Sequence, residues 1–164
     1  MAEISLRGQG IHTCGNLPEP GQVAPSFVLT KTNLKDVGLH DFAGKRKIIS
    51  LFPSLDTPVC ALSIKHFNET DYGTDTVILT VSADLPFAMQ RFCKQNKVKN
   101  IIGLSMMRDR NFAQDYGAMM IDGPLAGLLA RAVIVLDSSN KVIYSELVAE
   151  LSNEPNYTQL AAIL

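Results

Sequence analysis

The sequence has only three cysteines and no long apolar run. Three cysteines are too few, and odd in number, for the disulfide framework of a secreted mini-protein. No run of apolar residues approaches the length of a membrane-spanning helix, and the opening MAEISLRGQGIH lacks the apolar segment of a signal peptide. We therefore expect a cytoplasmic protein without a membrane segment, in which any pairing of cysteines is transient or catalytic.

The sequence also lacks an excess of charge and the common cofactor motifs. Its 15 basic and 16 acidic residues nearly cancel, so nucleic acid is not an expected partner. The histidines at positions 12, 40 and 66 have no metal-ligand spacing with the cysteines, and no C-x-x-C pair is present. Gly8-Gln9-Gly10 lacks the third glycine of a dinucleotide fingerprint. We therefore expect no metal and no cofactor.

The pattern of apolar residues predicts one α/β domain spanning residues 1–164, of which 46% are hydrophobic. The segments 4–6 and 11–14 predict an N-terminal hairpin. Strands are expected at residues 26–30, 47–52, 76–82, 101–106, 132–136 and 142–148, and helices at 58–72, 85–95 (capped by Asp84), 111–116 and 157–164. Alternating strands and helices followed by a late hairpin indicate a mixed central sheet with helices on both faces.

The stretch FPSLDTPVCALSIKHF, residues 52–67, places Cys60 where a buried strand gives way to a helix. Thr57 is a suitable N-cap, and Pro58 suits the first helical position because its missing N–H would be unpaired there. Cys60 is then the third helical residue, near free backbone N–H groups and the positive end of the helix dipole, which favour a thiolate. Ile64 follows one turn later, so packing is expected to shelter the thiol.

The helix terminus alone is a weak activator of this thiol. It contributes about 0.3–1 kcal/mol, less than the roughly 1.4 kcal/mol that shifts the balance of thiol and thiolate tenfold. Catalysis would need a cation beside the sulfur and donors that stabilise the transition state. From these residues alone, Cys60 is explained as well by a packed cysteine as by a functional one. The same residues favour a packed cysteine at Cys93, and at Arg131 a strand-edge arginine paired with a carboxylate. Thr57 and Pro53 are explained as cap and turn residues.

Four segments carry a more specific pattern. Residues 52–60, FPSLDTPVC, have a proline, three residues, a threonine, two residues and a cysteine. The segment FAGKRK (42–47) precedes residues 52–60, and the segments SADLPFAMQRFC (82–93) and DGPLAGLLARAVIVLD (122–137) follow them. Together these segments resemble the peroxiredoxin family, in particular its bacterial thiol peroxidase subfamily. The resemblance runs from the N-terminal hairpin to the last helix, and it implies a thioredoxin-like fold that carries this hairpin.

The resemblance implies a role for each of five residues. Cys60 is similar to the peroxidatic cysteine, whose thiolate attacks a hydroperoxide and becomes a sulfenic acid. Thr57 would direct its hydroxyl at the thiolate and the peroxide, while Pro53 would shield the sulfur from bulk water. Arg131 would supply the cation. Cys93 would be the resolving cysteine, which condenses with the sulfenic acid to form an intrachain disulfide.

The resemblance also implies the partners of the reaction. Members of the family reduce hydrogen peroxide and organic hydroperoxides, are usually reduced by thioredoxin and tend to be homodimers. Leu85, Phe87 and Met89 are apolar residues expected near the site, and they favour alkyl hydroperoxides as substrates. Cys14 lies outside the family pattern, and we expect no redox role for it.

A disulfide requires Cα atoms within about 7 Å, which cysteines on two separate helices are not expected to satisfy in the folded protein. We therefore hypothesise that the first helical turns around Cys60 and Cys93 unwind between oxidation and resolution. Two other functions stay open. One is a redox sensor or binding protein on the same fold, in which Cys60 oxidises slowly, and the other is a thiol-disulfide oxidoreductase, which the missing C-x-x-C disfavours.

Overall fold

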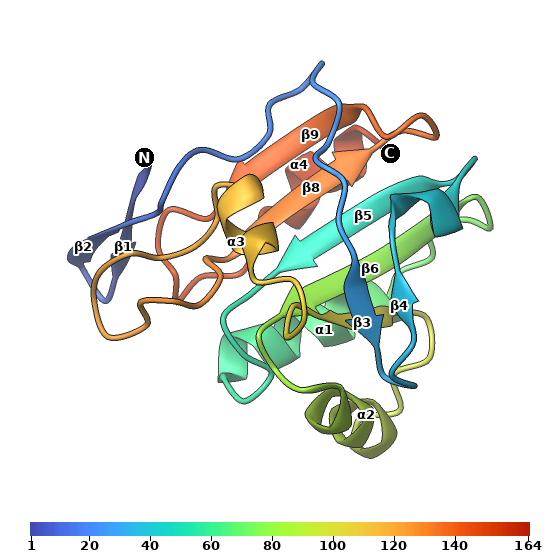
Figure 1. Ribbon diagram of the computed structural model, residues 1–164, viewed down its shortest axis with the longest axis horizontal. Coiled ribbons are helices and arrows are strands. Elements are labelled where there is room, and N and C mark those ends of the chain that lie inside the picture. The colour runs from blue at the N-terminus through green and yellow to red at the C-terminus, as the bar shows by residue number, and fades with distance from the viewer.

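The computed structural model describes residues 1–164 and centres on one mixed sheet (Figure 1). Its strands are β3 (Leu29–Lys31), β4 (Asp36–Val37), β5 (Arg46–Leu51), β6 (Thr76–Ser82), β7 (Ile102–Ser105), β8 (Ala132–Leu136) and β9 (Val142–Leu147). They lie in the order β4-β3-β7-β6-β5-β8-β9. The three central strands β5, β6 and β7 are parallel, and antiparallel strands extend the sheet on both sides.

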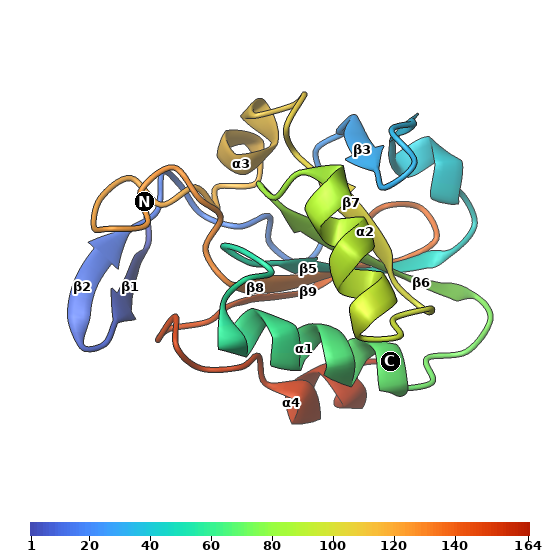
Figure 2. The same ribbon diagram turned by 90° about the horizontal axis from the view of Figure 1, so that it is seen from below.

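Helices cover both faces of this sheet, which confirms the predicted thioredoxin-like α/β architecture. They are the 3-10 helix η1 (Leu39–Phe42) and the α-helices α1 (Pro58–Glu69), α2 (Pro86–Gln95), α3 (Asn111–Asp115) and α4 (Tyr157–Ala162). Figure 2 shows α1 and α4 on one side of the sheet and α3 on the other. None of these helices combines the length and the apolar character needed to span a membrane.

Strand β5 shows why the sequence folds into layers. Ile48 packs with residues of α1 and α4, including Phe67 and Leu160, whereas Ile49 points into the larger core on the opposite face, beside Phe112 of α3. Successive side chains of a strand point to opposite faces, so an unbroken apolar run requires cover on both sides. The predicted two-sided burial of residues 47–52 is therefore confirmed.

The N-terminal hairpin is present and consists of β1 (Glu3–Leu6) and β2 (Gln9–His12), paired in antiparallel register. Arg7 and Gly8 join the two strands, both with positive φ (52° and 81°), as a two-residue type I′ turn requires. The hairpin forms a separate two-stranded sheet, which Figure 1 shows projecting from one end of the molecule. It brings the chain's first residues towards the active-site end of α1, as described below.

Several element boundaries differ from the predicted ones. The strand predicted at 26–30 begins at Leu29, and the helix predicted at 58–72 ends at Glu69. The short elements β4 and η1 were not predicted, because two and four residues carry too little periodicity to be recognised. The cap of α2 was predicted wrongly: Leu85 occupies the N-cap position, and Asp84 binds other groups.

Candidate active site

The sulfur of Cys60 is completely buried in the first turn of α1. Pro58 is the first helical residue, so Cys60 is the third, as predicted. The side chain packs in a small apolar cluster with Phe52, Leu55, Ile64 and Met89, and the last of these comes from α2. The cluster thus joins the helix that carries Cys60 to the helix that carries Cys93.

Arg131 lies directly against this sulfur. Its Nη1 donates a hydrogen bond to Cys60 Sγ at 3.3 Å, and its Nε donates to the Leu151 carbonyl at 3.1 Å. The residue is only 3% exposed, and no carboxylate lies within salt-bridge distance of it. Arg131 immediately precedes β8, an interior strand between β5 and β9. The alternative of a strand-edge arginine paired with a carboxylate is therefore wrong.

An unpaired buried guanidinium is costly, and its burial is explained if the nearby sulfur carries the compensating charge. Cys60 Sγ is the only side-chain atom to which this guanidinium donates a hydrogen bond. The guanidinium Nη2 donates to no protein group, and Arg131 lines a pocket that is described below. Arg131 therefore has one nitrogen on the sulfur and another without a protein acceptor.

The N-terminus of α1 leaves two backbone donors free. Thr57 occupies the N-cap position, as predicted, but its hydroxyl donates to the Ser54 carbonyl (3.1 Å) and forms no capping bond. The N–H groups of Val59 and Cys60 consequently have no acceptor within the protein. Free N–H groups at a helix start are an anion site, here next to the sulfur. No hydrogen bond joins Thr57 to Cys60 in this conformation, so its direct role stays a prediction.

A pocket of about 780 Å³ leads to this site. Pro53, Thr57 and Arg131 contribute to its wall, and its apolar lining comes from Leu6, Ile11, Val59, Leu125 and Leu151. Three of the predicted site residues thus share one pocket that adjoins the buried sulfur. The apolar residues expected here from the sequence lie elsewhere: Leu85 and Phe87 are exposed on α2, and Met89 is buried behind Cys60.

The N-terminal hairpin forms one wall of the pocket and is held in place by Glu150. The Glu150 carboxylate accepts hydrogen bonds from the Ser5 hydroxyl (2.6 Å) and from the backbone N–H of Arg7 (2.9 Å) and Gly8 (3.3 Å). The bond from Ser5 and then that from Arg7 lower the pKa of Glu150 to about 2. The carboxylate therefore stays ionised near neutral pH, and the wall remains attached.

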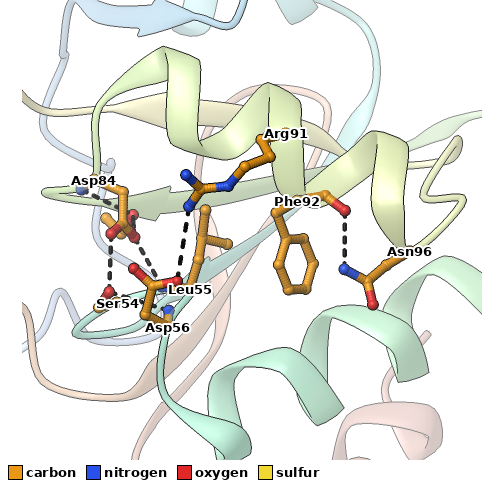
Figure 3. Close-up of polar contacts among 8 residues, drawn as sticks. Ser54, Leu55, Asp56, Asp84, Arg91, Phe92 and Asn96 are labelled. Carbon is orange, nitrogen blue, oxygen red and sulfur yellow. Dashed lines mark hydrogen bonds and ion pairs between the residues drawn. The ribbon is translucent and has the colours of Figure 1, made fainter.

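Asp84 ties the loop before α1 to the start of α2 (Figure 3). Its Oδ1 accepts from the Ser54 hydroxyl (2.8 Å), and its Oδ2 accepts from the backbone N–H of Leu55 (2.8 Å) and the Ser82 hydroxyl (2.7 Å). We call this set of bonds the Asp84 brace. Sequence reasoning missed it because Ser54 is 30 residues away, beyond any local spacing signal. The brace fixes the loop from which Pro53 and Thr57 reach the pocket.

Cys93 lies in the last turn of α2, with its thiol partly buried and unpaired. The expectation that it lies in a first helical turn is wrong, because α2 runs from Pro86 to Gln95. Burial raises the pKa of the Cys93 thiol above its ordinary value. Cys93 does not line the pocket of Arg131; it lines a second cavity, formed by α2 and by the strands β3 and β7. The structure therefore holds Cys60 and Cys93 as two free thiols in separate surroundings.

The remaining cysteine lies apart from both. Cys14 follows the N-terminal hairpin, and its thiol faces the carbonyl of Ala113 at 3.7 Å. It contacts neither the Cys60 cluster nor the cavity beside Cys93. No group of three or more metal-ligating side chains comes together anywhere in the structure.

Known proteins are similar to this chain over nearly all of its length. Residues 19–161 match the Redoxin family. The chain is 46% identical over 164 residues to the thiol peroxidases of Mycobacterium tuberculosis and Mycobacterium bovis, covering 100% of this chain and 99% of each relative. Among solved structures, a peroxiredoxin-like protein from Aquifex aeolicus is 35% identical with a TM-score of 0.92, covering 99% of this chain and 95% of that one. A thiol peroxidase from Chromobacterium violaceum has the same fold, with a TM-score of 0.91, 24% identity and coverages of 98% and 93%.

Proposed function

Because the chain belongs to the Redoxin family and, within it, to the bacterial thiol peroxidases, we propose that Cys60 is the thiol that reduces the peroxide. One observation supports this assignment above the others. The buried guanidinium of Arg131 donates to Cys60 Sγ at 3.3 Å and has no carboxylate partner. This guanidinium supplies the cation beside the sulfur that is needed because a helix terminus alone favours the thiolate only weakly. Neither of the other cysteines has such a partner.

The proposed first step breaks the O–O bond of the hydroperoxide. The Cys60 thiolate attacks the terminal oxygen, and the other oxygen leaves with the electron pair and takes up a proton, which gives an alcohol or water. Cys60 becomes a sulfenic acid. Negative charge develops on the leaving oxygen, where the free nitrogen of Arg131 and the unpaired N–H groups of Val59 and Cys60 are available as donors. Donors that meet charge only in the transition state accelerate the reaction.

Two further residues are proposed to complete this site. Pro53 is buried and lines the pocket that adjoins the sulfur, and we propose that it limits access of bulk water to the thiolate. Thr57 would turn its hydroxyl from the Ser54 carbonyl towards the peroxide oxygen when substrate enters the pocket.

Alkyl hydroperoxides are the proposed preferred substrates. The pocket of about 780 Å³ far exceeds what hydrogen peroxide requires, and its walls include leucine, isoleucine, valine and proline side chains. An apolar pocket with a few convergent polar groups is suited to a molecule with an organic tail and one polar end. The donors at the base of the pocket would bind the peroxide group, and the apolar walls would bind the tail.

The proposed second step is attack by the Cys93 sulfur on the Cys60 sulfenic acid: the S–S bond forms, the S–O bond breaks, and the leaving hydroxide takes up the proton lost by the Cys93 thiol and departs as water. Cys60 is fully buried in the first turn of α1, whereas Cys93 is in the last turn of α2 and lines a different cavity. We therefore propose that the first turn of α1 and the last turn of α2 unwind locally before the disulfide forms. The Asp84 brace must open if the loop before α1 moves.

Replacing Asp84 with asparagine tests this coupling. Asparagine retains one acceptor oxygen of two, so in the reduced protein we expect amide hydrogens of residues 54–62 to exchange faster, by about fivefold or more. The reaction with peroxide should slow by a similar factor because the loop is less well held. In the disulfide form the proposed unwinding opens the brace, so the amide hydrogens of residues 54–62 should exchange at the same rate in the variant and in the wild type.

Asp56→Asn is the matched control, since Asp56 lies in the same loop but is exposed. Figure 3 shows its ion pair with Arg91. The charged atoms are 4.0 Å apart and both side chains are exposed, so this pair is expected to contribute little to stability. Hydrogen exchange measured by mass spectrometry should therefore distinguish the two variants. Equal protection of residues 54–62 in the reduced and disulfide forms of the wild type would contradict local unwinding.

The proposed cycle as a whole is tested by a single turnover. One equivalent of cumene hydroperoxide is added to the reduced protein, the reaction is quenched within about a second, and the cysteines are mapped by mass spectrometry. Rapid formation of a Cys60–Cys93 link with Cys14 still free is the expected result. Unreacted thiols would instead favour the redox sensor or binding protein, which has no need to outpace a free thiol.

Replacing Cys93 with serine should separate the two steps. Cys60 should still consume one equivalent of peroxide at close to the wild-type rate and accumulate as a sulfenic acid, which a dimedone label detects by mass. Turnover with thioredoxin should fall to background because no intrachain disulfide forms. Cys14→Ser is the matched control and should leave both steps unchanged. Sustained thioredoxin-dependent turnover by the Cys93 variant would exclude Cys93 as the resolving residue.

Further parts of the proposal come from the family resemblance. We propose that thioredoxin is the reductant, that the protein is a homodimer in the cytoplasm and that residues 1–164 form one domain. The last statement is supported by the single large sheet, which draws strands from residue 29 to residue 147.

A further inference from the structure

A cavity of about 740 Å³ opens beside Cys93, and its charge is of one sign. Four lysines line it, at positions 31, 94, 97 and 99, and no aspartate or glutamate does. None of the four takes part in an ion pair. The whole chain has a formal net charge of −1, so four unpaired positive charges around one cavity are a marked local concentration. Such a cavity attracts an acidic partner.

The surroundings favour contact with a protein over a small enclosed ligand. Lys94, Lys97 and Lys99 are exposed and form a rim around the cavity. Phe87 lies on the same helix, α2, and is 62% exposed. Residues 87, 90 and 94 fall at i, i+3 and i+7 and therefore share one face of α2. An exposed aromatic side chain next to a charged rim is typical of a protein–protein contact.

We propose that this lysine-lined cavity is the docking site for the reductant, and that the reductant is a protein dithiol carrying carboxylates beside its attacking thiol. The inference rests on the proposed Cys60–Cys93 cycle. It adds the surface at which that cycle is closed and the charge that the partner must present there.

Docking at this cavity would bring the reductant to Cys93, which lines it, and not to the fully buried Cys60. The reductant's thiolate attacks Cys93 Sγ, the Cys60–Cys93 bond breaks, and Cys60 leaves as a thiolate beside Arg131. The second thiol of the reductant then attacks the mixed disulfide, which releases Cys93 to take up a proton and leaves the reductant as a disulfide. Two electrons pass from the reductant to the protein. This direction is favoured because a guanidinium stabilises the leaving thiolate at Cys60, and good leaving groups accelerate exchange.

Charge reversal at two exposed lysines tests the docking site. The variant Lys94→Glu with Lys99→Glu is compared with Lys45→Glu and Lys141→Glu, two exposed lysines outside the cavity that change the net charge equally. Each protein is first oxidised to the disulfide, and its reduction by thioredoxin and by dithiothreitol, an uncharged dithiol, is followed by rapid quenching. We expect reduction by thioredoxin to slow by about tenfold or more in the cavity variant only. Reduction by dithiothreitol should be unchanged in both variants.

The outcomes separate the docking site from the function on which it rests. Equal thioredoxin rates for the cavity and control variants would overturn the docking site. An equal loss with thioredoxin and dithiothreitol would also overturn it, because it would show a structural defect at Cys93. A wild-type disulfide that dithiothreitol reduces but thioredoxin does not would overturn the proposed reductant itself. The wild-type rate with thioredoxin should also fall as salt rises from about 0.02 M to about 0.3 M.

Discussion

Serine in place of Cys60 should abolish peroxide-dependent turnover, with a loss of ~10⁴-fold or more. Hydroxyl and thiol are similar in size, so the apolar cluster around this position should stay packed. The hydroxyl group, however, is not ionised near neutral pH and cannot replace the thiolate as the attacking group. Arg131 would then lose its anionic partner while its other donors stayed in place. The rate of peroxide consumption under thioredoxin recycling is the measurement.

This result has a matched control in Cys14→Ser, which removes a thiol outside the site and should retain full turnover. Circular dichroism and thermal unfolding show whether the Cys60 variant is folded. A folded Cys60→Ser protein with more than about a hundredth of the wild-type rate would mean that another group attacks the peroxide.

Replacing Arg131 with methionine should have the second largest effect. The loss of a donor to the developing oxyanion and of the cation beside Cys60 should slow the reaction with peroxide by about 10²–10³-fold. The free energy of unfolding of this variant should increase or stay the same, although its reaction with peroxide is slower. An apolar side chain removes the cost of burying a guanidinium that has no carboxylate partner, although it also loses the bond to the Leu151 carbonyl.

Stopped-flow rates and melting temperatures, measured on the same preparations, separate these effects. Arg131→Lys is the companion variant: it retains the charge but not the fork that reaches sulfur and substrate together, so an intermediate rate is expected. A methionine variant that reacts within about tenfold of the wild type would show that Arg131 is a structural residue. A variant that loses activity only in proportion to its loss of folded protein would show the same.

The layers of the fold could be predicted because each rests on a local pattern. The run at 47–52 is apolar on both faces, and the Thr57-Pro58 pair marks the start of α1, so residues close in sequence determine both elements. The position of Cys60 at that helix start followed from the same pair. The resolving role proposed for Cys93 came from the family pattern alone. Its own surroundings on α2 are those of an ordinary packed cysteine.

The parts that could not be predicted depend on contacts between distant residues. Asp84 looked like a helix cap because a short polar side chain before an apolar helix usually is one, but three donors outside the helix hold its carboxylate. The pocket wall from the N-terminal hairpin likewise depends on Glu150, more than 140 residues from the groups it binds. Neither arrangement has a spacing that the sequence displays.

The contact between Arg131 and Cys60 bears on the reduction potential of the proposed disulfide. In the proposed cycle the guanidinium stabilises a thiolate, and Cys60 can be a thiolate only in the reduced protein. Once Cys60 is bonded to Cys93, Arg131 has no anion beside it. The contact therefore favours the dithiol over the disulfide, and every ~1.4 kcal/mol of this preference raises the potential of the couple by about 30 mV. The residue that we propose to speed the attack on peroxide would thus also make the oxidised protein a better electron acceptor.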